Sequence, residues 1–253
     1  MIFPIGDDNT GRLAAPVVTV GLIAANVLVF VFLQGFGTND RFTYAFSTVP
    51  REILTGRDIV TDDRTIEDPL SGQTFRAPGL QPTPGSVYLT LLTSMFMHGG
   101  LAHLFGNMLF LWIFGDNVEN AMGRIRFLVF YLLCGLLAGL AHVFATAAFG
   151  GDPLIPSLGA SGAISGVLGG YILLFPHRRV RVLVLRMITT MPAYMALGLW
   201  FLFQIVSGVG MLGGGSQSGG VAYAAHIGGF IAGVVLVKVF ARTDIARSPQ
   251  QSS

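Results

Sequence analysis

Charged residues are scarce in this sequence. Asp, Glu, Lys and Arg together make up 11% of its 253 residues, whereas a soluble domain carries about 25%. Apolar residues make up 52%, and the mean hydropathy is +0.67. Because so little charge is left to cover a surface in contact with water, the composition indicates an integral membrane protein rather than one or two soluble domains.

Other absences exclude several classes of function. The single cysteine, Cys134, allows neither an intrachain disulfide nor a cysteine-based metal site. The net charge is only +2 and the basic residues are scattered, so we expect no nucleic-acid partner. No carboxylate pair lies in an apolar run, which argues against an intramembrane aspartic protease, and His98 and His103 lack the H-E-x-x-H spacing of a zinc protease. We therefore expect no metal and no cofactor, with haem ligation by paired histidines left as an alternative.

Long charge-free runs predict six membrane-spanning helices, since a span needs about 20 mostly apolar residues. The first run is too long, and starts with too little basic charge, for a cleaved signal peptide, so it is expected to be retained. Seven glycines in residues 207–220 divide the last run in two. The predicted spans cover residues 14–33, 100–115, 127–149, 161–175, 192–206 and 221–240. This pattern predicts an all-α membrane protein, a six-transmembrane-helix bundle forming a single domain over residues 1–253.

A long loop at residues 35–85 separates the first two spans. It contains several acidic and basic residues, and loops of this length are usually functional or disordered. Its apolar parts, at 42–46 and 53–54, are compatible with a location on the membrane surface. A partly ordered polar insert is an equal alternative.

Lys and Arg are distributed unevenly between the two sides of the predicted spans, and this asymmetry sets the orientation. Ten lie on the side of the chain ends, and five lie on the other side, all in the 35–85 loop. The ten are Arg12, Arg124, Arg126, Arg178, Arg179, Arg181, Arg186, Lys238, Arg242 and Arg247. We therefore expect both termini, including a short tail at 241–253, to be cytoplasmic, and the 35–85, 150–158 and 207–220 loops to face outward. The expected location is the inner membrane of a prokaryotic cell.

Polar residues at membrane depth are costly and by default mark functional sites. Three groups of them lie at the starts of the second, fourth and sixth spans. They are His98, His103 and Asn107, then Ser161 and Ser165, and finally His226. These three spans all run from outside to inside, so the three groups share one depth near the outer face.

Small residues favour a close approach of the fourth and sixth spans. Gly162 and Gly166 lie beside the serines of the fourth span, and Gly229 and Gly233 form a G-x-x-x-G in the sixth. Glycine faces allow membrane helices to pack with their backbones close together. These four glycines are therefore the predicted helix-packing residues.

Close packing of these spans is expected to bring Ser161 within hydrogen-bond reach of His226. A hydroxyl is a weak nucleophile until a base removes its proton, and histidine is the usual base. No Asp or Glu in the outer half of these spans can orient the ring, so the prediction is a catalytic dyad rather than a triad. Taken singly, a serine or histidine in a membrane helix is more often a packing or structural residue, and it is the shared depth that favours catalysis.

In combination these motifs resemble the rhomboid intramembrane serine proteases. The matching segments are, in order, His98-Gly-Gly-Leu-Ala-His103-Leu-Phe-Gly-Asn107, Glu119-Asn-Ala-Met-Gly123-Arg124, Gly159-Ala-Ser161-Gly162 and Ala225-His226-Ile-Gly-Gly229. The resemblance implies a rhomboid-like bundle, surrounded by lipid. Its expected substrates are single-pass transmembrane proteins with helix-destabilising residues near their outer ends.

The resemblance also implies a role for each site residue. Ser161 is the expected nucleophile and His226 its base. His103 and Asn107 are expected near the oxyanion, together with the backbone N–H of Ser161, and His98 is an accessory residue at the entrance of the site. Some members carry a tyrosine stacked on the catalytic histidine where this chain has Ser165, which leaves the orientation of the ring open. The alternatives are a non-proteolytic, client-binding relative with the same fold and a small-solute transporter.

Overall fold

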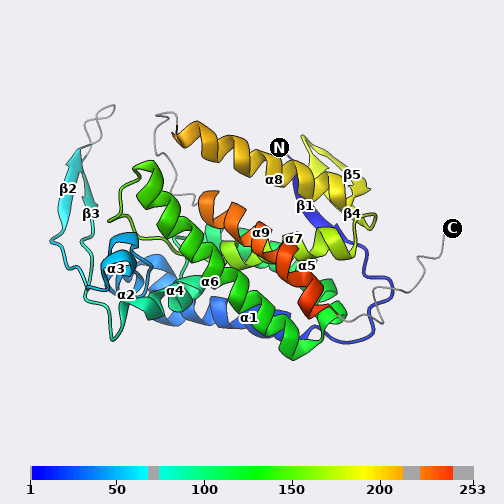
Figure 1. Cartoon of the computed structure of the whole chain (residues 1–253), viewed down its shortest axis with the longest axis horizontal. Coiled ribbons are helices and arrows are strands. Elements are labelled where there is room, and N and C mark those ends of the chain that lie inside the picture. The colour runs from blue at the N-terminus through cyan, green and yellow to red at the C-terminus, as the bar shows by residue number, and fades with distance from the viewer. Residues whose placement is uncertain (1, 68–73, 213–222, 242–253) are drawn as a thin grey trace.

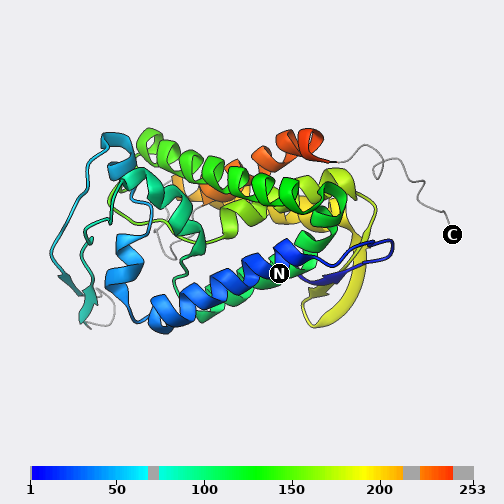
Figure 2. The same cartoon turned by 90° about the horizontal axis from the view of Figure 1, so that it is seen from below.

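The computed structural model of the chain describes residues 2–67, 74–212 and 223–241. Helices dominate these residues and pack into a bundle that carries a small β-sheet at each end (Figures 1 and 2). Residues 213–220 of the predicted outer loop at 207–220, and residues 242–253 of the predicted tail at 241–253, lie outside the described residues.

A helix lies at each of the six predicted positions in the part of the chain that the structure describes. They are α1 (Val17–Leu28, continued by a π-helical turn at Val29–Leu33), α5 (Leu101–Met122), α6 (Arg124–Phe149), α7 (Ser161–Leu174), α8 (Ala193–Leu212) and α9 (Tyr223–Phe240). Two of them run further than predicted. α5 continues past residue 115 because its polar last turns bond to neighbouring segments, and α8 continues past residue 206 because glycine weakens a helix without breaking it.

Helix length supports fewer spans than the six predicted. Among the described helices, α6 and α9 are long and apolar enough to cross a membrane on their own. Joining α5 to the preceding segment Val87–Phe96 gives a third candidate, with a bend of 79° between the two parts. α1, α7 and α8 are apolar but shorter over their described residues.

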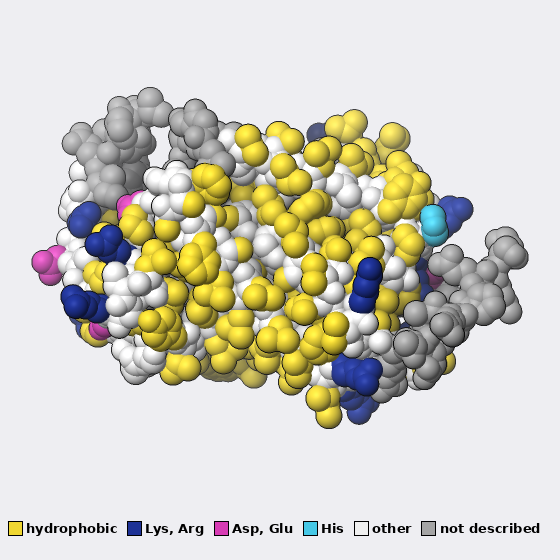
Figure 3. Space-filling model, viewed as in Figure 1, with side chains coloured by type: hydrophobic (Ala, Val, Ile, Leu, Met, Phe, Trp, Pro, Cys, Tyr) yellow, Lys and Arg dark blue, Asp and Glu magenta, His cyan; other side chains and the backbone are white. Residues whose placement is uncertain are grey.

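Exposed side chains agree with a membrane environment. Apolar side chains cover most of the middle of the face in Figure 3, and Lys and Arg side chains lie mostly toward its two ends. Large apolar residues that are more than half exposed occur along several helices, for example Phe32 beyond α1, Phe105 on α5 and Val239 on α9. Apolar surface of this extent is typical of a protein in contact with lipid.

α7 is the centre of the bundle. All residues from Gly162 to Tyr171 are buried, and the helix packs against α5, α6 and α9. With 14 residues, α7 is about 21 Å long, against roughly 30 Å for the hydrocarbon core of a bilayer. If one end of a helix of this length lies at one surface of the hydrocarbon core, its other end therefore lies about 10 Å below the opposite surface.

The all-α prediction is wrong at both ends of the molecule, where strands pair, and the larger sheet includes two strands from the predicted basic loop. The strands β1 (Ile2–Asp7), β4 (Arg179–Val184) and β5 (Met187–Pro192) form an antiparallel sheet in the order β1-β4-β5. Val180 and Val182 are fully buried while Arg179 and Arg181 are exposed, which is the two-residue period of a strand. The residues predicted to form a basic cytoplasmic loop are therefore a hairpin.

The first strand of this sheet lies along the helices. β1 contacts both α5 and α8. Phe3 meets Phe110 edge-on, with 6.0 Å between ring centroids. At the other end of the strand, Asp7 Oδ2 accepts hydrogen bonds from Asn117 Nδ2 at 2.8 Å and from the Tyr171 hydroxyl at 2.6 Å. Phe110 and Asn117 are about 10 Å apart along α5, so β1 runs beside this helix rather than away from it.

The connection between α1 and α5 is built from short elements. They are α2 (Asp40–Ala45), α3 (Pro50–Thr55), β2 (Arg64–Glu67), β3 (Thr74–Ala77) and α4 (Thr90–Thr93), with 3₁₀ turns at Gly35–Gly37, Val87–Leu89 and Ser94–Phe96. β2 and β3 pair as an antiparallel hairpin at the end of the bundle opposite β1. Thr43, Ala45 and Ile53 are buried against the protein, whereas Leu54 is exposed. Of the apolar residues considered for the membrane surface, two are thus buried, one is exposed, and the aromatic residues Phe42, Tyr44 and Phe46 are partly exposed.

Candidate active site

A hydrogen bond joins Ser161 and His226 across the interface of α7 and α9. Ser161 is the first residue of α7, and His226 lies in the first turn of α9. The distance between Ser161 Oγ and His226 Nε2 is 2.9 Å. A hydroxyl in this position can pass its proton to the ring.

Backbone contact between α7 and α9 places this pair. A Cβ atom on Gly229 would lie 2.1 Å from the carbonyl oxygen of Gly162, and one on Gly233 would lie 1.9 Å from that of Gly166. No side chain can occupy such a position, so glycine is needed at both places for the helices to come this close. The two G-x-x-x-G partners predicted from the sequence therefore face each other in the structure.

The second ring nitrogen of His226 has a partner that the motifs did not predict. His226 Nδ1 lies 2.8 Å from Oε1 of Gln204, a buried residue of α8. An amide oxygen can only accept a hydrogen bond, so Nδ1 carries the ring proton and Nε2 presents its lone pair to Ser161. One signal could have found Gln204: it is the only amide or charged side chain in the fifth predicted span.

Aromatic rings also border His226, but they do not come from position 165. Ser165 is buried and donates a hydrogen bond to the carbonyl oxygen of Ser161 at 2.7 Å, so its hydroxyl points along α7. Trp200 of α8 lies 6.0 Å from His226 between ring centroids, and Tyr223 approaches edge-on at 6.5 Å. α8 thus supplies two of the groups that orient the histidine.

His103 lies against the turn that leads into α7. A Cβ atom on Gly159 would lie 2.9 Å from both Cε1 and Nε2 of His103, and 3.7 Å from Ser161 Oγ. Gly159 also has a φ of +125°, which residues with side chains rarely adopt. The missing side chain therefore lets the His103 ring sit directly beside the turn that carries Ser161.

His98 is fully buried next to His103, rather than open at an entrance. The two rings meet edge-on with 5.2 Å between their centroids. Gln34 fixes the backbone at this point, because its Oε1 accepts from the His98 N–H and its Nε2 donates to the His98 carbonyl, both at 2.9 Å. Within the described residues, no group of three or more His, Cys, Asp or Glu side chains is arranged to hold a metal ion.

In the described part of the chain, unpaired hydrogen-bond donors lie at the start of α7 and on α5. Asn107 is buried on α5, one turn after His103, and its Nδ2 has no hydrogen-bond partner among the described residues. The first N–H groups of α7 also lack an acceptor within the helix, since the first such bond runs from Ile164 N to the Ala160 carbonyl. The N–H of Ser161 itself belongs to this set. Negative charge that develops on an oxygen beside Ser161 is therefore stabilised by donors and by the positive end of the helix dipole.

A small cavity adjoins Ser161. Its volume is about 30 Å³, and a cavity needs roughly 10–15 Å³ to hold one water molecule. Polar groups line it, among them the side chains of Thr48, Ser94 and Ser161. The site therefore has space for a water molecule next to the nucleophile.

The family described as Rhomboid domain matches residues 85–243, which is more than half of the chain. This match includes the helices that carry Ser161, His226, Gln204 and Asn107. The chain belongs to the rhomboid family. With its apolar helices, this rhomboid is a membrane protein.

Curated relatives of this rhomboid come from bacteria and from mitochondria. Rhomboid protease GluP of Bacillus subtilis is 37% identical over 219 residues, which are 84% of this chain and 35% of the relative. Rhomboid protein 1, mitochondrial, of Saccharomyces cerevisiae is 33% identical over 147 residues, 58% of this chain and 40% of the relative. Presenilin-associated rhomboid-like protein, mitochondrial, of Homo sapiens is 34% identical over 125 residues, 46% of this chain and 32% of the relative. This rhomboid thus matches between about a third and two fifths of the length of each of these relatives.

Proposed function

We propose that this rhomboid is an intramembrane serine endopeptidase that cleaves transmembrane segments of other membrane proteins. The observation that carries the proposal is the 2.9 Å hydrogen bond between Ser161 Oγ and His226 Nε2. It gives a hydroxyl at the start of a central, buried helix the base that it needs to act as a nucleophile. The name of the relative from Bacillus subtilis, which is similar over 84% of this chain, describes a protease.

The reaction begins when His226 Nε2 takes the proton of Ser161 and Oγ attacks the carbonyl carbon of a peptide bond. Gln204 keeps the second ring proton on Nδ1 and hydrogen-bonds to the imidazolium that forms. The oxyanion is stabilised by the N–H of Ser161, with Asn107 and His103 as side-chain donors. The C–N bond then breaks as His226 returns its proton to the leaving nitrogen, and an acyl-enzyme ester on Ser161 remains.

A water molecule from the cavity beside Ser161 completes the cycle. His226 removes a proton from the water as the oxygen attacks the ester carbonyl. The ester bond breaks, Ser161 recovers its proton, and the new carboxyl terminus leaves. The lining of the cavity supports this step, since the hydroxyl of Ser94, which accepts a hydrogen bond from Thr48 Oγ1, can donate to a bound water.

The expected substrate is a single-pass transmembrane protein with helix-destabilising residues at the depth of Ser161. A regular helix hides each carbonyl group in an intrahelical hydrogen bond, so the segment must become extended before Oγ can reach it. Glycine and proline lower the cost of this change. The length of α7 supports a cleavage depth of about 10 Å below the membrane surface.

The proposed topology has six spans with both termini in the cytoplasm of a prokaryotic cell, as the basic residues predict. A cytoplasmic reporter fused after Arg247 should be active, and a reporter that needs export should be inactive. The opposite result would overturn the proposed orientation.

The proposed activity is tested with purified protein in liposomes and a panel of single-pass substrates, whose products are identified by mass spectrometry. We expect cleavage by the wild type, and none by Ser161→Ala or His226→Ala. Ser165→Ala is the matched control, because it changes a buried serine one turn further along α7 and should leave most activity intact.

A fluorophosphonate probe separates an unsuitable substrate panel from an inactive protein. It should label Ser161 in the wild type and leave both dyad variants unlabelled. A wild type that neither cleaves nor reacts with the probe would favour a non-proteolytic, client-binding protein instead, whereas cleavage that persists in Ser161→Ala would exclude Ser161 as the nucleophile.

A further inference from the structure

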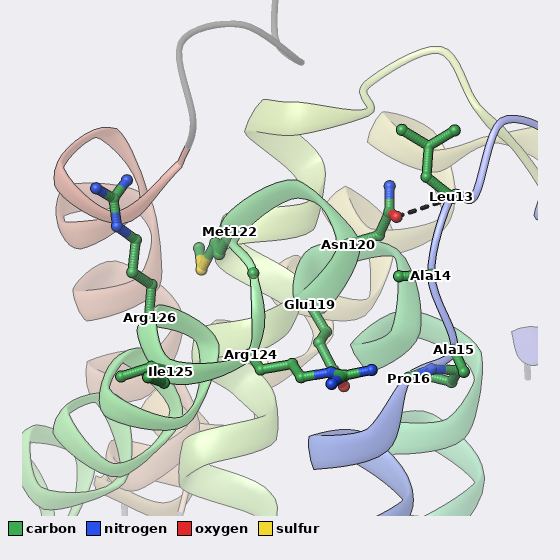
Figure 4. Close-up of a pocket in the computed structure, with 11 residues that line it drawn as sticks. Leu13, Ala14, Ala15, Pro16, Glu119, Asn120, Met122, Arg124, Ile125 and Arg126 are labelled. Carbon is green, nitrogen blue, oxygen red and sulfur yellow. Dashed lines mark hydrogen bonds between the residues drawn. The ribbon is translucent and has the colours of Figure 1, made fainter.

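A second cavity lies at the end of the bundle that carries the β1–β4–β5 sheet, away from Ser161. Its volume is about 670 Å³, within the usual range for small-ligand sites. It lies between the segment before α1, the last turn of α5 and the first turn of α6 (Figure 4). Its lining residues are Leu13, Ala14, Ala15, Pro16, Glu119, Asn120, Met122, Gly123, Arg124, Ile125 and Arg126.

The charged groups of this cavity favour an anion. Arg124 and Arg126 form no ion pair with any described residue, whereas Arg12, at the same end, is paired with Asp116 at 2.7 Å. In Figure 4, Arg124 extends toward Glu119 and Pro16, and Arg126 projects on the other side of the helix junction.

Glu119, the one carboxylate in the lining of the cavity, already accepts hydrogen bonds from the start of α1. Glu119 Oε1 accepts from Val18 N at 3.0 Å, and its Oε2 accepts from the backbone and hydroxyl of Thr19 at 2.7 and 2.8 Å. These bonds direct its charge toward the start of α1. Asn120 uses its oxygen to accept from Leu13 N at 3.0 Å, which leaves its Nδ2 as a donor.

The rest of the lining favours a ligand with an apolar part. Leu13 and Ile125, which lie on opposite sides of the cavity in Figure 4, are 83% and 80% exposed. Such exposure of large apolar side chains is unfavourable in water and favourable against acyl chains. Guanidinium groups bind phosphate oxygens in a bidentate manner, and basic pockets between membrane helices bind anionic lipid headgroups.

We propose that this cavity binds the phosphate headgroup of an anionic glycerophospholipid, with the phosphate on Arg124, with Arg126 as a second cation on the other side of the helix junction, and with the exposed side chains of Leu13 and Ile125 against apolar parts of the lipid. A lipid held there joins three parts of the chain: the segment before α1, the end of α5 and the start of α6. It stabilises the junction where Glu119 holds the start of α1. The proposal is independent of proteolysis and applies equally to an inactive protein.

The test uses the full chain, delipidated in a neutral detergent. Native mass spectrometry and thermal unfolding are followed during titration with phosphatidylglycerol, with phosphatidylcholine, and with glycerol phosphate as the headgroup alone. We expect saturable binding and a higher Tm with phosphatidylglycerol, and much weaker effects with the other two. Equal binding of phosphatidylcholine, or glycerol phosphate that binds as tightly as the lipid, would overturn the proposal.

Variants separate the two halves of the site. Arg124→Gln should weaken phosphatidylglycerol binding roughly tenfold, as expected for loss of one hydrogen bond to a charged group, and Arg126→Gln should also weaken it through the loss of a nearby positive charge. Leu13→Ser should weaken binding of the lipid and leave that of glycerol phosphate unchanged. Lys238→Gln is the matched control, since Lys238 is an exposed cation in the last turn of α9 outside the cavity. A loss for Lys238→Gln equal to that for both arginine variants would show general attraction to the basic end instead of a site.

Discussion

His226 lies between two helix interfaces that are built in different ways. Toward α7, backbone meets backbone, and a single methyl group on Gly233 would lie 1.9 Å from a carbonyl oxygen. Toward α8, rings fill the space: Phe201 stacks on Phe230 with 4.1 Å between centroids, and the Trp200 ring lies 6.4 Å from that of Phe230. The first interface cannot shift without separating the helices, whereas rings can slide. The stiffer contact with α7 thus fixes the distance from His226 to Ser161. The softer contact with α8 fixes the orientation of the His226 ring.

The largest effect is expected from adding one methyl group to the stiffer interface. Gly233→Ala must push α7 and α9 apart, which costs about 1–3 kcal/mol for overpacking. Because a displacement of about 1 Å at a reacting centre can reduce rate by roughly a hundredfold, cleavage should fall by at least this factor. Thermal unfolding and initial cleavage rates measure the two effects.

Gly198→Ala provides the comparison on α8, the helix that forms the softer interface. It places the same methyl group on α8 in open space, where replacing a helical glycine stabilises by about 0.5–1 kcal/mol. Its activity should stay near that of the wild type. Equal losses for the two variants would mean that the two interfaces do not differ as described.

A smaller effect is expected at Asn107, which belongs to neither interface and is proposed to act only on the oxyanion. Loss of one such donor costs roughly 3 kcal/mol, or about a hundredfold in rate. Asn107→Ala should therefore lower kcat by about this factor while KM stays nearly constant, since the charge exists only in the transition state. A change confined to KM would place Asn107 in substrate binding instead.

Removing the partner on α8 should cost less. Gln204→Leu leaves Nδ1 of His226 without its acceptor, and loss of one hydrogen bond of about 1 kcal/mol corresponds to roughly a tenfold lower kcat. Gln204→Glu keeps an acceptor at the same place and should restore most of the rate. If Gln204→Leu is as active as the wild type, the α8 interface has no part in orienting the base.

The smallest effect on cleavage is expected outside both interfaces, at Asp7. Burial raises the pKa of the Asp7 carboxyl to about 6, although hydrogen bonds from Tyr171 and Asn117 oppose the shift. Between about pH 4 and pH 6, the Asp7 carboxyl is therefore protonated in the folded protein and ionised in the unfolded chain. The free energy of unfolding falls as pH rises through this window. Asp7→Asn should remove this loss, so its Tm should exceed that of the wild type at pH 7 and match it near pH 4, with kcat unchanged.

Asp8→Asn is the matched control for this experiment. Hydrogen bonds from Thr10 lower the pKa of the Asp8 carboxyl, so its removal should slightly reduce stability above the window in which Asp8 titrates. The same upward shift in Tm for both variants would point to net charge rather than to the burial of Asp7.

The positions of the helices could be predicted from the sequence because a long apolar run is what a membrane-spanning helix requires. The positions of Ser161 and His226 followed from the same reasoning, since both are polar and both begin a run. Gln204 was missed because it stands alone within its run, and a single amide in a membrane helix gives no direction toward a partner on another helix. Only the packing of α8 against α9 brings it to His226.

The β1–β4–β5 sheet could not be predicted from the count of Lys and Arg residues that was used to orient the spans. Arg178, Arg179, Arg181 and Arg186 were counted as charges at a membrane surface, and this count takes no account of the valines between them. Alternation in β4 becomes meaningful only when a partner strand is known. That partner, β1, lies at the far end of the sequence, with Ile2 opposite Val184 and Asp7 opposite Val180.

The pairing of β1 with β4 also sets an order of assembly during synthesis. β1 leaves the ribosome about 170 residues before its partner, a delay on the order of ten to thirty seconds at usual rates of translation. During this time Phe3 and its neighbours have no strand to join, while α1, α5, α6 and α7 are made in turn. β1 is therefore translated well before β4, and it pairs with that strand only after the helices between them have been made.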